Sequence, residues 1–369
     1  MSAPLRAVLA LLCLPGLTLA DDAPAAPGAA GPAWLLEPEE DPPLPRWGRG
    51  PLEVRDPFIL ALPRLSPWAR SPRIHEHLEL GLSARGTWSN SFAFEPGRYL
   101  VDGEVRQVDF VARLGLFDRF ELGLLLPYQW RGGGVMDGFI EGFHDAFDLP
   151  QNRRDRLKRG RWTVNGVDPA GRSFRWDRKG HGLGDLIAEG RALLTRGGPL
   201  LPAAAVGLRV RLPTGARRFD FADGVDASLS IDLSQRLGER SPFIVYAGGA
   251  WTYHTDARVN GLVQARNRGM FYLGGEVELT RWLSIVGHAW IESRRELRLF
   301  ADLPLVLNPR DPRFGSRNLD FGNWVTYAAV AFKLEPVEGL TIELGMLENI
   351  VDPETTADFT LVFGLGWTI

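Results

Sequence analysis

The last eleven residues alternate between apolar side chains and side chains that are mostly small or polar, and this pattern constrains the fold more than any other feature. The apolar positions are Phe359, Leu361, Phe363, Leu365, Trp367 and Ile369, and the positions between them, Val362 apart, are Thr360, Gly364, Gly366 and Thr368. A β-strand with this period of two has one apolar face and one face that can meet water. In lipid only a helix or a closed barrel gives every backbone group a partner. We therefore expect the final strand to close a barrel by pairing with the first strand.

The same alternation recurs in eleven earlier runs, all after His75. They are Leu78 to Trp88, Val108 to Leu116, Phe120 to Trp130, Leu186 to Leu194, Ala204 to Leu212, Ala227 to Leu233, Phe243 to Tyr253, Phe271 to Leu279, Leu283 to Ile291, Trp324 to Leu334 and Leu340 to Met346. None of the apolar sets contains a charged residue. A charge on a lipid-facing strand costs roughly 2 to 4 kcal/mol at the bilayer midplane, so lipid would enforce this segregation.

A soluble barrel would give the same alternation with its apolar face inward, and the connections between runs decide between the two. Short connections (117–119, 195–201, 238–241, 280–282, 335–339) alternate with mostly longer ones (90–104, 131–181, 213–224, 254–268, 293–321, 348–356). Tight turns would then lie at one end and long loops at the other, as in outer-membrane barrels. The predicted fold class is all-β: an antiparallel transmembrane outer-membrane β-barrel of about 12 strands, with one short helix in a long extracellular loop.

The charged residues fall on the opposite face of the runs, which would line the lumen. They are Glu79, Arg85, Asp109, Arg113, Glu121, Asp185, Glu189, Arg191, Arg209, Arg211, Asp226, Asp232, Glu276, Glu278, Glu292, Lys333, Glu343 and Asp358. Twelve are acidic and six are basic. Because rings of like charge set the selectivity of a pore, this excess predicts a preference for cations or neutral solutes over anions.

The chain before the first run divides into three parts. Residues 1–20 are typical of a secretory signal peptide, which contains the single cysteine, Cys13. Residues 21–46, rich in Pro and Ala, are expected to be a disordered leader. Residues 47–73 hold enough apolar side chains to pack in or under the barrel, which we assign to residues 74–369. The mature chain would then be exported to the bacterial outer membrane without a thiol or a disulfide.

The formal net charge of -3 excludes the strongly basic balance of a nucleic-acid binder. No cofactor or metal site is indicated, and we expect a monomer embedded in outer-membrane lipid and lipopolysaccharide. The function best supported is a passive channel or transporter for a small solute. A plugged barrel with a structural or surface-adhesion role is the main alternative, and an outer-membrane lipid hydrolase is the third.

The long connection 131–181 contains a charged motif on a predicted amphipathic helix, with Asp137 as its N-cap. Glu141, His144, Asp145 and Asp148 share this stretch and could bind a cation, although a solvated or ion-paired helix face explains them as well. A basic run follows at 153–161, which could contact the phosphates of lipopolysaccharide or simply be solvated.

No convincing catalytic group emerges, so we predict a protein that is not an enzyme. Ser284 and His288 share one strand face, but four residues at ~3.3 Å place them about 13 Å apart, too far for a nucleophile and its base. His254 has no evident orienting carboxylate nearby in the sequence.

Several short motifs resemble those of a bacterial family known as domain of unknown function 3187. They are Gly50-Pro51-Leu52 with Val54-Arg55 and Pro57, the loop from Asp137 to Phe147 with Leu149-Pro150, Gly182-Leu183-Gly184-Asp185-Leu186, Leu212-Pro213-Thr214-Gly215 and Glu348-Asn349. The Gly-Leu-Gly-Asp-Leu and Leu-Pro-Thr-Gly pieces are also similar to outer-membrane proteins of phenol-degradation operons. The resemblance would run from about Trp47 to the end of the chain. It implies an outer-membrane-type barrel and leaves the function open.

Overall fold

The computed structural model describes residues 47–95, 97, 99–146, 158–167, 171–176, 178–216, 223–256, 258–259, 262–293, 324–349, 357 and 359–369. The predicted signal peptide (1–20), the predicted leader (21–46) and Asp358 lie outside the described residues, as does most of the basic run 153–161.

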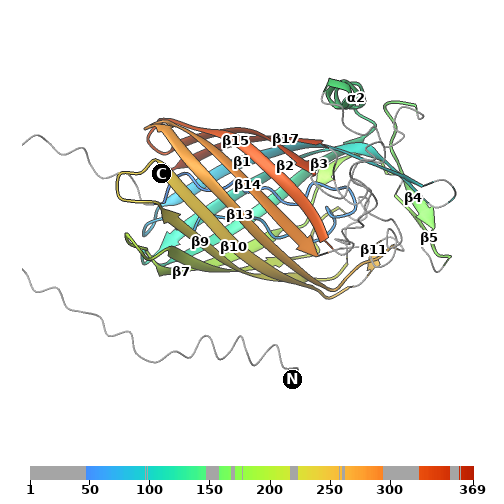
Figure 1. Cartoon of the computed structure of the whole chain (residues 1–369). Helices are drawn as coiled ribbons and strands as arrows, with labels where there is room; N and C mark the ends of the chain where they lie inside the picture. Colours follow the sequence, from blue (N-terminus) through green and yellow to red (C-terminus); the bar gives the residue numbers. More distant parts are fainter. Residues whose placement is uncertain are drawn as a thin grey trace, which may run out of the picture. The chain divides into compact units, whose positions relative to one another are not determined.

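Twelve antiparallel strands form one closed sheet (Figure 1). In order around the barrel they are β1 (Leu80–Glu95), β2 (Tyr99–Leu116), β3 (Phe120–Gly132), β7 (Ile187–Thr195), β8 (Ala203–Arg211), β9 (Asp226–Arg236), β10 (Phe243–His254), β13 (Asn267–Thr280), β14 (Leu283–Ser293), β15 (Trp324–Val337), β16 (Leu340–Asn349) and β17 (Phe359–Thr368). The predicted all-β, twelve-stranded barrel is confirmed.

The final strand closes the barrel as its alternation predicts. β17 pairs with β1 in a continuous register from Gly81 opposite Thr368 to Asn90 opposite Phe359. The backbone N–H of Ile369 also donates to the carbonyl of Leu80 at 2.9 Å. This seam gives both edge strands a partner, which is the condition for a sheet within lipid.

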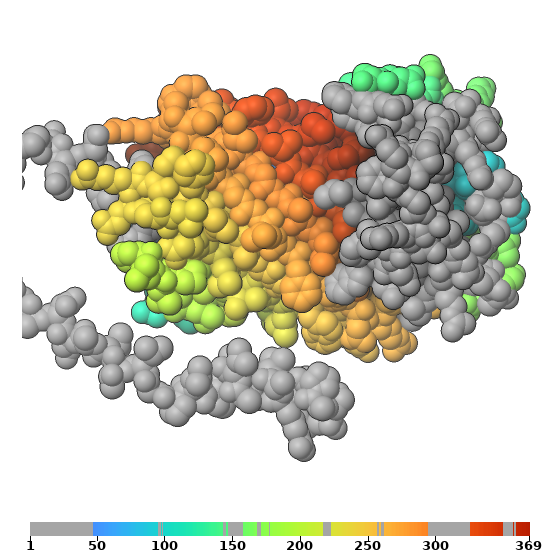
Figure 2. Space-filling model, viewed as in Figure 1, coloured from blue at the N-terminus to red at the C-terminus, as the bar shows by residue number. Residues whose placement is uncertain are grey.

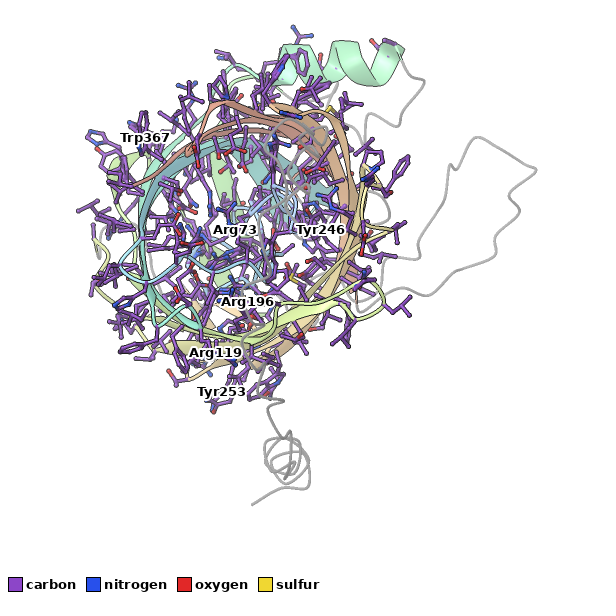
Figure 3. All side chains as sticks on the ribbon, turned by 90° about the vertical axis from the view of Figure 1, so that its left-hand side faces the viewer. Arg73, Arg119, Arg196, Tyr246, Tyr253 and Trp367 are labelled. Carbon is purple, nitrogen blue, oxygen red and sulfur yellow. The ribbon has the colours of Figure 1, made fainter. Side chains whose placement is uncertain are left out.

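The apolar face of the strands points outward. Phe110, Leu124, Leu273 and Leu365 each expose more than half of their surface. Figure 3 shows Trp367 and Tyr253 outside the ring of strands, and strands β9 to β16 form one continuous outer wall in Figure 2. So large an apolar surface is unfavourable in water and matches the lipid-facing band of an outer-membrane barrel. Among the described residues, no helix has the length and apolar character to cross a membrane.

One predicted loop is wrong. The connection 90–104 is mostly strand, because β1 continues to Glu95 and β2 begins at Tyr99. Phe92 and Val101 in these extensions are both buried. Val101 pairs with Ala93 on the inward face and packs in the cluster around Phe58, whereas Phe92 lies on the opposite, outward face. Because Phe92 is covered on the outward face, the alternation that marks a lipid-facing strand is not required there.

The connection 131–181 holds the predicted helix, α2 (Asp137–Ala146), and the short strands β4 (Thr163–Val167), β5 (Ser173–Arg175) and β6 (Gly180–Leu183). β4 extends the wall beside β2 and β6 extends it beside β3. A separate small hairpin joins β11 (Arg258–Val259) to β12 (Leu262–Val263). α2 lies outside the ring of strands in Figure 3, with Ile140 buried in a cluster with Phe359. The predicted short helix is thus present in this long loop, and it packs through Ile140 against the start of β17.

Candidate functional site: a filled lumen

Residues 47–73 occupy the inside of the barrel. We call these residues the inserted segment. Its rising arm (47–57) runs from the end with the tight turns to the long-loop end, and its returning arm (61–73) runs back, as the contacts with the wall show. At the entry, Gly48 and Gly50 have positive φ angles of 62° and 83°. A Cβ on Gly48 would lie 2.4 Å from the Tyr246 hydroxyl, so only glycine allows the backbone this close to the wall.

The entering backbone is held by wall side chains. The N–H groups of Arg49 and Gly50 donate to the Glu276 carboxylate at 2.9 and 3.1 Å. Lys333 donates from Nζ to the carbonyl of Pro51 at 3.0 Å. Glu276 and Lys333 belong to β13 and β15, so the segment bridges different strands of the wall.

A buried ionic cluster joins the rising and returning arms near the turn end. Glu53 pairs with Arg85 at 2.5 Å and with Arg113 at 2.6 Å. Arg70, on the returning arm, lies 2.9 Å from Glu121 and 2.6 Å from Glu189.

The guanidinium groups of Arg85, Arg113 and Arg70 surround the Glu53 carboxylate at 2.5, 2.6 and 3.4 Å. The interior near the turn end is therefore charged and paired.

Further up, the rising arm makes a bidentate contact. Arg55 donates from Nε and Nη2 to the two carboxylate oxygens of Asp109 at 3.1 and 2.8 Å. The Tyr327 hydroxyl donates to Asp56 at 2.9 Å. Two hydrogen bonds from one guanidinium fix both position and orientation, so this pair sets the height of the segment in the lumen.

The top of the segment is apolar. Phe58, Ile59 and Leu60 are fully buried in a cluster with side chains from the long loops and the strand extensions. The loop and wall members are Ala93, Tyr99, Val101, Val105, Trp162, Val164, Phe174, Trp176, Val259 and Leu262. We call this cluster the apolar cap. It packs the top of the segment against the wall and the long loops.

The returning arm pairs with β9 at the long-loop end and with β8 lower down. Arg64 lies 3.3 Å from Asp226, whose second oxygen accepts from the Leu65 N–H at 2.9 Å. The Trp68 ring carries the Arg209 guanidinium at 4.0 Å from its centroid, a cation–π contact.

The structure buries most of the residues that the alternation assigns to the lumen. Asp109, Arg113, Glu121, Asp185, Glu189, Arg191, Arg209, Arg211, Asp226, Asp232, Glu276, Glu292 and Lys333 are buried, whereas Arg85, Glu278, Glu343 and Glu79 are half-buried. Several also form ion pairs with one another across neighbouring strands and loops: Arg211 with Asp185 and Asp226, Arg191 with Asp232, and Lys333 with Glu343. Glu79 lies just before β1 and accepts from the Glu76 N–H at the rim.

Three wall arginines are absent from the residues that the alternation assigns to the lumen. Arg131 is buried at the end of β3, one residue beyond its run. Arg236 pairs with Glu278 at 2.6 Å, and Arg268 pairs with Glu292. These two stand beyond the alternating runs that were assigned to their strands, at the end of β9 and the start of β13. Extending the period of two by up to three residues would have found all three.

The described charged residues of the α2 motif have different partners and do not form one cluster. Asp137 accepts from the Asn90 amide and from the Gly160 N–H, while Glu141 pairs with Arg159 of the basic run. The Glu141 carboxylate raises the pKa of the exposed Arg159. Asp145 is exposed, and the side chain of His144 lies outside the described residues, as does Asp148. No group of three potential metal ligands occurs within the described ranges.

His254 differs from the expectation that it lacks a carboxylate. Its Nδ1 lies 3.0 Å from Asp226, which stands directly opposite it on β9. Strand pairing brings together residues 28 positions apart, which the sequence alone did not reveal. Ser284 and His288 face Lys333 and Ala329 across the β14–β15 pair, and both are buried.

Comparison with solved structures gives low overall similarity to outer-membrane proteins. The COG4313 outer membrane channel from Pseudomonas putida F1 is 12% identical, with 80% of this chain and 97% of that chain covered and a TM-score of 0.49. The NanC porin is 7% identical (78% and 98% covered, TM-score 0.41). The CymD monoaromatic hydrocarbon channel is 9% identical (80% and 89% covered, TM-score 0.36). No curated protein matches the chain significantly.

The family comparison is specific. A family model described as "Protein of unknown function (DUF3187)" matches residues 44–294. The match starts close to where the resemblance was expected to start, but it ends before Glu348 and Asn349. It covers the inserted segment together with the strands from β1 to β14. The chain therefore belongs to the DUF3187 family.

Proposed function

We propose that the protein is an outer-membrane channel for a small solute whose resting lumen is closed by residues 47–73, and that passage requires this segment to loosen or move. The barrel supplies a polar interior across the membrane, and the segment fills it.

The way the segment is anchored carries this proposal. Arg55, Arg64 and Arg70 hold it to wall carboxylates through buried ion pairs. Such pairs add little net stability compared with apolar contacts, because separated charges regain hydration. A permanent plug would be better served by apolar packing, whereas ionic anchors allow release when water and ions enter.

The charge balance supports the same reading. Five arginines against Glu53 and Asp56 give residues 47–73 a net positive charge, which offsets the acidic excess of the wall. Removal of the segment would uncover Asp109, Glu121 and Glu189. The opened lumen should therefore prefer cations or neutral solutes, as the wall charges alone suggest.

A liposome-swelling assay with neutral sugars tests the proposal. The full chain should give slow swelling, and a variant lacking residues 47–73 should swell at least about tenfold faster, since an open twelve-stranded lumen is narrow but aqueous. Equal rates for the two proteins would refute occlusion by the segment.

A plugged barrel with a structural or surface role is the second candidate, and the apolar cap favours it, because Phe58, Ile59 and Leu60 make contacts that resist release. Absence of swelling in both proteins, each shown to be folded and inserted, would favour this alternative.

At the long-loop end we propose contact with lipopolysaccharide. α2 lies outside the barrel wall there, and the exposed Lys158 and Arg159 follow it. Arginine and lysine bind phosphate oxygens through charge-assisted hydrogen bonds. Replacing both with glutamine should weaken binding of the folded barrel to vesicles that contain lipopolysaccharide, and unchanged binding would argue against the contact.

A further inference from the structure

A cavity of about 140 Å³ lies at the turn end, between the rising arm of the inserted segment and the β16–β17–β1 part of the wall. Thr368 and Gly81, the last residue of β17 and the second of β1, line it together with Arg49 and Glu53 of the segment. Figure 3 looks onto this end of the barrel.

The space exists because inward positions on the closing strands are small. Gly364, Gly366, Ser83 and Gly81 stand where other strands carry arginines and carboxylates. A Cβ on Gly366 would meet Ser83 at 3.6 Å, an ordinary contact, so the absence of a side chain there is not imposed by crowding. At Gly81 and Gly364 the space is already taken, because a Cβ would lie 2.2 Å from His75 and 2.7 Å from Glu343. Gly366 is therefore the position that borders open space beside the segment.

The charged lining of the cavity is mainly cationic. Arg49, Arg85, Arg113 and Lys333 face Glu53 and Glu343. Lys333 and Glu343 pair at 2.6 Å. The remaining lining carries three guanidinium groups against one carboxylate, and Arg49 also lies within 4.0 Å of three carboxylates outside the lining, those of Glu276, Glu278 and Glu335.

Glu53 is the only carboxylate that pairs with Arg85 among the described residues, whereas Arg113 also lies 3.7 Å from Glu189 and Arg70 also pairs with Glu121 and Glu189. The two oxygens of Glu53 are shared by Arg85, Arg113 and Arg70, at 2.5, 2.6 and 3.4 Å. Each guanidinium has five N–H donors in a planar fork that matches an oxyanion. Arg113 Nε is buried without a hydrogen-bond partner among the described residues. Arg113 Nε points toward Glu189, whereas Arg85, which lines the cavity, donates to Glu53 through Nη1 alone and so has further N–H donors next to the open space.

We infer that this cavity is a binding site for a small oxyanion, a carboxylate or a phosphate, which enters from the turn end and is held by Arg85 and Arg113. The inference rests on the proposed channel, because it names a class of ligand that would loosen the segment closing that lumen. At ~30 Å³ per water, the cavity holds one such anion with a few waters. A bound oxyanion competes with Glu53 for the two arginines and so weakens the ionic cluster that joins the two arms of the segment.

This also revises the expected selectivity. The acidic excess of the wall predicts a lumen that disfavours anions, yet the closed protein presents a cationic chamber at the turn end. The difference arises because the segment covers the wall carboxylates and leaves Arg85 and Arg113 beside the cavity.

Equilibrium dialysis of the full chain in detergent, with radiolabelled inorganic phosphate and separately with acetate, tests the site without any conductance reading. We expect saturable binding of at least one anion. Arg85→Gln and Gly366→Val should each weaken it by about tenfold or more, since one removes a charge-assisted donor and the other fills the space.

Arg236→Gln is the matched control, because Arg236 is also a wall arginine near the turn end but does not line the cavity. Binding by this variant should match that of the unmodified chain. Absence of anion binding by a folded sample, or equal loss in Arg236→Gln and Arg85→Gln, would overturn the inference. If the binding result holds while the variant lacking residues 47–73 passes no solute, the anion site stands and the channel proposal fails. Preference for phosphate or for acetate identifies the class of anion.

Discussion

The inserted segment is held by different kinds of contact at the two ends of the lumen. At the long-loop end Phe58, Ile59 and Leu60 pack into the apolar cap, whereas at the turn end Glu53 and Arg70 sit in a network of ion pairs beside a cavity. Apolar packing excludes water and resists rearrangement. Paired charges can exchange partners with ions and water. The segment is thus fixed at the long-loop end and open to competition at the turn end, which suggests that any release begins at the turn end.

The largest effect is expected from removing the Arg70 guanidinium from the ionic cluster at the turn end. Arg70→Met leaves Glu121 and Glu189 without the guanidinium that lies within 3 Å of both. Breaking a buried pair in this way costs about 3 to 5 kcal/mol. Amide hydrogen exchange should show loss of protection along residues 64–72. Adding Glu189→Gln should restore part of that protection, and no difference between the single and double variants would argue against the role given to this pair.

The second-largest effect is expected from a substitution in the apolar cap. Leu60→Ala removes a fully buried side chain and should cost about 2 to 5 kcal/mol, depending on how far the site collapses. Protection should fall at residues 58–62 and remain at the turn end. Leu208→Ala, on the lipid-facing surface, serves as the control. Equal loss of amide protection at residues 58–62 and in the ionic cluster at the turn end would contradict the claim that these two regions are stabilised independently.

The middle of the segment allows a charge exchange. Arg55→Asp alone places a second carboxylate near that of Asp109, and two neighbouring negative charges repel each other. The double variant Arg55→Asp with Asp109→Arg should recover most of the protection of the rising arm. Failure of the double variant to improve on the single one would show that the pair does not set the height of the segment.

The smallest effect is expected on selectivity. In a barrel that lacks residues 47–73, Glu276→Gln with Glu278→Gln should lower the cation preference, because two wall carboxylates become neutral. The reversal potential in a salt gradient should move toward zero while conductance changes little. An unchanged reversal potential would count against a conducting path along this part of the wall.

The barrel was predictable because lipid imposes a strict rule on each strand. The absence of charge from alternate positions in runs such as Phe271 to Leu279 marks the outer face without any knowledge of pairing. Where that rule stops, the prediction stops. Phe92 and Val101 extend strands beyond the lipid, and Arg236 and Arg268 lie past the alternating runs.

The arrangement inside the lumen was harder to foresee. Residues 47–73 have no period, and the sequence does not show which wall carboxylate meets Arg55 or Arg64. Likewise His254 meets Asp226 only through the β9–β10 register. The sequence does hold one signal of the insertion: an arginine-rich segment next to a wall with an acidic excess.

Single-channel conductance in a planar bilayer, with a salt gradient, tests the central claim most directly. The full chain should be closed or show brief openings, and the chain without residues 47–73 should conduct steadily with a cation-leaning reversal potential. Steady conductance by the full chain with the same reversal potential as the deletion variant would contradict the claim that this segment closes the lumen.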